Sequence, residues 1–161
     1  MVGDASSEFI ANLLVEHRAF NEFVELLQSE QEALQRGDVD HLVSLAQLKS
    51  SKVVALAQLE DQRNRKLAAA GFKADLVGMG TWLKQHAGDY PGAEKTWAEI
   101  LSKARQAQIL NQSNGMMIEQ KLHHNKQALA ILQAAANQAS TYGPDGQTHA
   151  GKRGGRPLGK V

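Results

Sequence analysis

The sequence contains no cysteine, little proline and few aromatic residues. Without cysteine, the chain forms neither disulfides nor thiolate metal sites, a composition that fits a reducing compartment. The prolines are Pro91, Pro144 and Pro157, so no proline interrupts a helix anywhere before Pro91. Half of the aromatic side chains fall at core spacing, namely Phe9, Phe20, Phe23 and Trp97.

Neither the charge nor the hydropathy points to a membrane or to nucleic acid. The formal net charge is +1, so no strong overall field draws the chain to a charged surface. Residues 1–10 lack the basic and apolar segments of a signal peptide. No stretch approaches the roughly 20 apolar residues of a membrane span. We therefore expect a cytoplasmic protein that does not insert into a membrane.

Two long helices are predicted, over about residues 6–36 and 39–70. In each, apolar residues recur at steps of three and four, the heptad pattern of a coiled coil or helix bundle. The first series is Ile10, Leu13, Phe20, Val24, Leu27 and Leu34, with His17 and Gln31 at the intervening positions. Gly37 is suited to end the first helix and Asp38 to cap the second, so the short link predicts an antiparallel hairpin.

A short connecting helix over residues 74–87 and a third long helix over residues 93–139 are predicted next. The third helix keeps the spacing of three and four, although the middle of its seam is polar and small. Residues 140–161 are rich in glycine and basic side chains and lack the apolar surface needed for a core.

The predicted fold is therefore all-α. Residues 1–139 are expected to form an elongated antiparallel bundle, or coiled coil, of three long helices with one short connecting helix. Residues 140–161 are expected to form a disordered, basic C-terminal tail.

No catalytic or metal-binding motif is found in the sequence. The six histidines are scattered, and none has a His-Glu-x-x-His or zinc-type spacing. A phosphate-binding glycine loop and a nucleophile elbow are also missing. We predict a protein that is not an enzyme and takes no metal or cofactor. The basic tail would make only weak, salt-sensitive phosphate contacts, so nucleic acid is not an expected partner.

Two features do not follow from the needs of a stable bundle. The segment from Asn111 to Gly115 places poor helix formers in the middle of the third helix. Asn111 and Gly115 lie on the predicted seam, where they would form a register-setting polar layer; the alternative is a site held for a partner. Tyr142 follows the bundle and is suited to docking, because aromatic residues dominate interface hot spots; the alternative is a plain helix stop before a linker.

The second half of the third helix is apolar over a wide arc. The arc is formed by Ile118, Leu122, Leu129, Ile131 and Leu132. Because the third helix is predicted to be longer than the hairpin, this arc would lack a complete partner within the chain. An exposed apolar stripe usually marks an interface, so we hypothesise that it binds the helix of a client protein.

Several parts of the chain together form a pattern that covers most of its length. The matching pattern comprises Asn111-x-x-Asn114-Gly115 in a late helix, Thr141-Tyr142-Gly143, the ending Arg156-Pro-Leu158-Gly159, and an early Leu26-Leu27-x-x-Glu30-x-x-Ala33-Leu34. Basic residues follow the early pattern at Lys49 or Lys52 and at Arg63 or Arg65. Together, these parts resemble the FlgN family, and the resemblance covers essentially the whole chain.

This resemblance implies a cytoplasmic chaperone of the flagellar type III export system. Such chaperones bind the hook–filament junction proteins FlgK and FlgL, prevent their premature assembly and deliver them to the export gate and its ATPase components. The client-binding residues implied here are Asn114, Ile118, Leu122, Asn125, Leu129 and Leu132. Tyr142 would be the contact to the export gate.

Two other readings of the sequence stay open. In the first, the heptad seam drives self-association, and the protein is a coiled-coil adaptor or structural protein, with a homodimer as one form. In the second, more distant reading, the basic tail binds nucleic acid, and binding would weaken steeply with salt.

Overall fold

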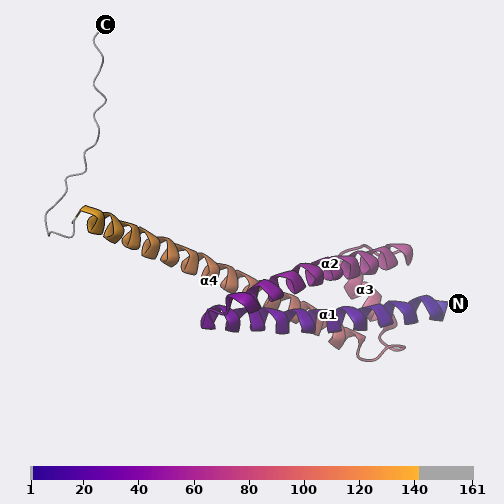
Figure 1. The fold of residues 1–161 in the computed structure, drawn as a ribbon. Coiled ribbons are helices and arrows are strands. Elements are labelled where there is room, and N and C mark those ends of the chain that lie inside the picture. The colour runs from indigo at the N-terminus through magenta and orange to yellow at the C-terminus, as the bar shows by residue number, and fades with distance from the viewer. Residues whose placement is uncertain (1, 142–161) are drawn as a thin grey trace, which may run out of the picture. The chain divides into compact units, whose positions relative to one another are not determined.

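A computed structural model describes residues 2–141 as four helices (Figure 1). They are α1 (Val2–Arg36), α2 (Val39–Ala69), α3 (Leu76–His86) and α4 (Ala93–Thr141). No strand occurs in this range, so the predicted all-α fold with three long helices and a short connector is confirmed. Beyond Thr141, the predicted tail lies outside the described residues.

The described chain divides into two units between Met117 and Ile118. We call the described residues up to Met117 the bundle. We call the residues from Ile118 the C-terminal segment, which is helical to Thr141. α4 contributes its first half to the bundle and its second half to the segment. The predicted division into a bundle over 1–139 and a tail over 140–161 stays a prediction.

The first helix begins at Val2, earlier than the predicted start near residue 6. Asp4 lies in the first turn, where its negative charge interacts favourably with the positive end of the helix dipole. Helix formation is cooperative, so a strong apolar pattern further along the chain extends the helix through residues of lower propensity. The predicted start of the first helix near residue 6 is therefore wrong.

A tight turn joins α1 to α2. Gly37 has a φ of 69°, the left-handed conformation that glycine adopts without steric cost. The Asp38 carboxylate then accepts a hydrogen bond of 3.1 Å from the His41 N–H and caps α2. Because the link is so short, α2 runs back along α1 (Figure 1). The predicted hairpin is confirmed.

Ion pairs connect the two helices of the hairpin, always with the acid on α1 and the base on α2. The pairs are Glu8 with Lys66, Glu16 with Arg63, Glu22 with Lys52 and Glu30 with Lys49. The residue numbers of the acids increase along α1 while those of their basic partners decrease along α2, as an antiparallel pairing of the two helices requires. The charge pattern thereby favours α2 over a like-charged helix as the partner of α1.

Large aromatic and aliphatic side chains fill the end of the bundle that contains α3. Asp75 caps α3 by accepting a hydrogen bond of 2.7 Å from the Gly78 N–H. The ring centroids of Phe9 and Trp82 lie 4.2 Å apart. The buried cluster comprises Phe9, Leu13, Leu67, Met79, Trp82, Leu83, Ala93, Trp97 and Ile100. The connecting helix therefore closes this end of the core.

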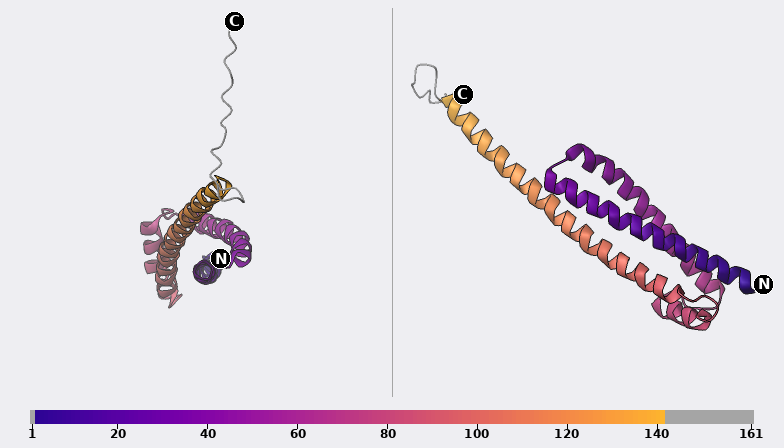
Figure 2. Two further views of the ribbon diagram at one scale, coloured as in Figure 1. Left: turned by 60° about the vertical axis from the view of Figure 1, so that its left-hand side comes forward. Right: turned by 90° about the horizontal axis from the view of Figure 1, so that it is seen from below.

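A second cluster fills the bundle nearer the turn between α1 and α2. Its members are Phe23, Val24, Leu26, Leu27, Ala33, Leu45 and Ala107. Residues early in α1 pack with the start of α4, and later residues of α1 pack with Ala107. Within the bundle, α1 and α4 therefore run in the same direction, and Figure 2 shows the two helices alongside each other.

Candidate functional site

The C-terminal segment carries its apolar side chains on the outside. Every residue from 118 to 137 is exposed, and residues 127–137 include no charged side chain. The exposed fractions are 39% for Ile118, 55% for Leu122, 59% for Leu129, 69% for Ile131 and 65% for Leu132. Asn125 lies among them and is also exposed.

Five of the six predicted client-binding residues share one face of this helix. Ile118, Leu122, Asn125, Leu129 and Leu132 follow each other at steps of four and three, which places them on one stripe. We call this stripe the apolar face. Its one polar member, Asn125, lies in the middle.

Asn114, the sixth predicted residue, lies in the interior of the bundle and is 0% exposed. Its Nδ2 donates hydrogen bonds of 2.9 Å to the Leu27 carbonyl oxygen and of 2.9 Å to Glu30 Oε1. Glu30 also accepts from Lys49 Nζ, at 3.1 Å to Oε1 and 3.3 Å to Oε2. These groups form a polar cluster that joins α1, α2 and α4. A client could contact Asn114 only after α4 separated from α1.

A polar layer is thus present at this level of the bundle, and Asn114 is its buried amide. Asn111 is exposed, and Gly115 is partly buried with open space where a Cβ would lie. The observed seam of α4 runs through Trp97, Ile100, Ala107 and Asn114, which turns it away from Asn111. In the sequence, the alanine and glycine residues of this helix leave it ambiguous which of its faces is buried. The specific roles assigned to Asn111 and Gly115 stay predictions.

Next to His17, the sequence pattern missed a buried carboxylate. Glu16 is buried on α1, whereas His17 is partly exposed and its Nε2 lies 2.8 Å from Glu99 Oε2 on α4. The gap in the apolar series between Leu13 and Phe20 was the available signal, because a buried helix position without an apolar residue needs a polar partner.

Arg63 on α2 is the partner of Glu16. Its guanidinium carbon also lies 4.7 Å from the centre of the Trp97 ring, so one side chain contacts both α1 and α4. Burial raises the pKa of the Glu16 carboxyl above its ordinary value of 4.5, and the hydrogen bond from Arg63 opposes that rise. The negative charge of Glu60 adds to the rise in pKa.

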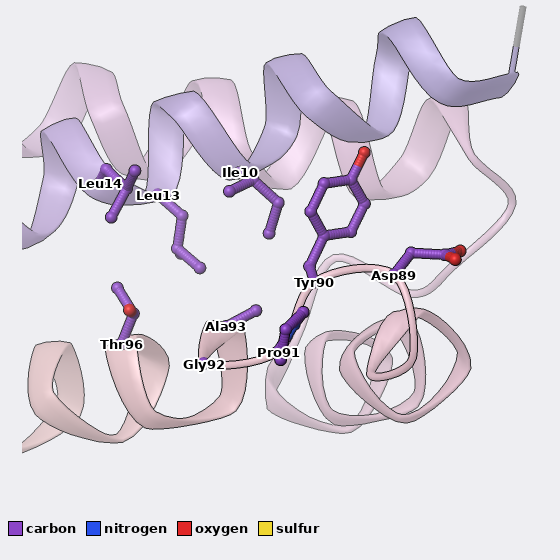
Figure 3. A pocket seen from close by; sticks show the side chains of 9 residues that line it. All are labelled: Ile10, Leu13, Leu14, Asp89, Tyr90, Pro91, Gly92, Ala93 and Thr96. Carbon is purple, nitrogen blue, oxygen red and sulfur yellow. The ribbon is translucent and has the colours of Figure 1, made fainter.

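A pocket of about 300 Å³ lies between α1 and the loop that leads into α4 (Figure 3). It is lined by Ile10, Leu13, Leu14, Asp89, Tyr90, Pro91, Gly92, Ala93 and Thr96. Figure 3 shows the Tyr90 ring reaching from the loop toward α1. The walls are mainly apolar and bring no nucleophile together with a base, so this pocket does not have the arrangement of a catalytic site.

Residues 2–141 contain neither a group of metal ligands nor a membrane-spanning helix. In that range, no three His, Asp or Glu side chains are grouped closely enough to hold a metal ion. No helix of the described part combines the length and the apolar character needed to cross a membrane. Tyr142 lies outside the described residues, so its docking role stays a prediction.

The sequence is similar to known proteins along most of its length. The sequence model described as FlgN protein matches residues 1–150. The flagella synthesis protein FlgN of Yersinia enterocolitica is 30% identical over 145 residues, covering 84% of this chain and 90% of that protein. The proteins of the same name from Salmonella typhimurium and Escherichia coli are 29% and 27% identical over 140 residues, covering 86% of this chain and 88% of each relative. No solved structure matches the chain.

Proposed function

The chain belongs to the FlgN family, and we propose that it acts in flagella synthesis as a cytoplasmic export chaperone. In this proposal its clients are the hook–filament junction proteins FlgK and FlgL. The protein covers their terminal helices, prevents premature assembly and delivers them to the flagellar type III export gate. It works by binding and not by catalysis.

The observation that carries this proposal is the apolar face of the C-terminal segment. Leu122, Leu129 and Leu132 are each more than half exposed. Fully covering a leucine side chain contributes about 1.5–3 kcal/mol, and much of that contribution is not realised while these side chains are more than half exposed. An amphipathic client helix laid along the face would cover them, which is a recurring mode of peptide recognition.

The absence of charge from much of the same helix, and its one polar residue on the apolar face, fit this mode of binding. Because residues 127–137 carry no charge, a client helix meets no charged group there that would have to lose its water on binding. Asn125, in the middle of the face, can exchange hydrogen bonds with a polar group of the client and so favour one register over others. The face is therefore suited to an apolar helix with a polar residue at one position.

The test measures binding of the C-terminal fragments of FlgK and FlgL from the same genome by titration calorimetry. The full chain carrying Leu122→Gln, Leu129→Gln and Leu132→Gln should bind at least about 100-fold more weakly, since three covered leucines are lost. A matched control carries Val39→Gln, Val43→Gln and Val54→Gln on α2, where the valines are 67%, 58% and 57% exposed. The control should bind like the wild type.

Unchanged affinity in the leucine variant, with its helicity retained, would remove the apolar face from the proposal. If neither fragment binds and sedimentation shows dimers that the leucine variant abolishes, the protein is a self-associating coiled coil instead. A further variant, Tyr142→Ala, should keep client affinity and lose binding to export-gate components.

A further inference from the structure

The polar cluster of the bundle lies where the apolar packing of α4 is weakest. Between Ile100 and Asn114, the one buried apolar residue of α4 is Ala107, and Leu110 packs partly buried against the same apolar cluster. Leu101 and Ile109 are 42% and 56% exposed. Trp97 and Ile100 hold the start of α4 in the first cluster, whereas the small side chain of Ala107 forms only a shallow ridge. At this level, apolar packing alone therefore opposes a shift of α4 along α1 by one turn only weakly.

Hydrogen bonds from Asn114 do not tolerate such a shift. Its Nδ2 faces two acceptors, the Leu27 carbonyl and Glu30 Oε1, so its amide orientation is chemically determined. A shift by four residues would bring Leu110 or Ile118 to this position, and neither side chain can donate a hydrogen bond. Glu30, only 5% exposed, would then be left with Lys49 as its one side-chain partner.

The cluster is not arranged for maximum stability. Asn114 Oδ1 is buried without a hydrogen-bond partner, and Glu30 is a buried charge. A leucine at this position would avoid both the unpaired oxygen and the burial of an amide. Buried asparagines in coiled coils have both effects, because they lower the stability of the coiled coil and specify one register.

We propose that Asn114, with Glu30 and Lys49, is a register lock that fixes the axial position of α4 on the α1–α2 hairpin. The lock goes beyond the proposed function and holds whether or not the chain binds a client. Asn114 is a positioning residue in the free protein, and its hydrogen bonds select one alignment of α4 at this level, where Ala107 offers little apolar ridge to fix it.

Spin labels measure the axial position directly, because the chain has no cysteine of its own. Ala11→Cys on α1 and Gln112→Cys on α4 are exposed sites far apart along the bundle axis. Pulsed electron spin resonance on the full chain should give one narrow distance in the parent protein. With Asn114→Leu, we expect a higher thermal midpoint together with a second distance, displaced by up to about 5.4 Å, the rise of one helical turn.

Asn111→Leu is the matched control, since it makes the same chemical change on the exposed side of the same helix. It should leave a single distance. If Asn114→Leu does not fold, Asn114→Ala is measured in its place, and it should also broaden the distance. A single parental distance in a folded Asn114 variant would overturn the register lock, as would a second distance in the Asn111 control.

Discussion

The bundle and the C-terminal segment use the same apolar residue types in opposite ways. Leu27 in the bundle is 0% exposed, whereas Leu129 in the segment is 59% exposed, although both lie on an apolar stripe at helical spacing. The first leucine stabilises the fold, and the second is free to stabilise a complex. Hydrophobic periodicity therefore identifies a contact face without telling whether the contact is internal or with a partner.

The sharpest test of the internal side of this contrast is Trp82→Ala. Trp82 is 3% exposed, packs on Phe9 and stacks on His86 with ring centroids 4.1 Å apart. Removing a buried tryptophan side chain should lower the free energy of unfolding by about 3–5 kcal/mol. Urea titration followed by circular dichroism measures the loss.

Val77→Ala on the same helix provides the control for Trp82→Ala. Val77 is 71% exposed, so the free energy of unfolding should change by less than about 0.5 kcal/mol. Equal effects of the two substitutions would mean that α3 is not part of the core.

Two glycines also differ in their surroundings, because one is crowded by neighbouring backbone and the other faces open space. A Cβ at Gly78 would lie 1.8 Å from the Lys73 carbonyl oxygen, so Gly78→Ala should destabilise by about 1–3 kcal/mol. A Cβ at Gly115 meets nothing within 4 Å, so Gly115→Ala should stabilise by about 0.5–1 kcal/mol through helix propensity. Thermal unfolding of both variants measures the two signs. A stabilising Gly78→Ala would contradict the close approach of the loop to α3.

A smaller and pH-dependent effect is expected at Glu16. Its pKa is raised by burial, so the folded chain binds this proton more tightly than the unfolded chain. The contribution of Glu16 to the free energy of unfolding is fully present below about pH 4.5, the ordinary pKa of a glutamate. It is lost as the pH rises through the higher pKa of Glu16 in the folded chain. Wild type should therefore lose stability relative to Glu16→Gln over that interval in urea titrations. A relative gain would show that the charge of Arg63 outweighs burial.

Sequence predicted the hairpin and the helix count well because their signals are local. Gly37 and Asp38 lie next to each other and determine the turn by their own conformations. The phase of α4 was less predictable, since alanines and Gln108 leave several faces equally plausible. Whether Asn114 is buried depends on Leu27 and Glu30, far away in the chain, and no local pattern contains that information.

The smallest effect on stability is expected for the exposed leucines of the apolar face. Leu129→Gln and Leu132→Gln together should change the free energy of unfolding of the bundle by less than about 0.5 kcal/mol, because neither side chain is covered in the free protein. Urea titration followed by tryptophan fluorescence isolates the bundle, since Trp82 and Trp97 both lie in its core. A loss above about 2 kcal/mol would mean that these leucines are packed in solution, and the apolar face would then belong to the fold instead of a client.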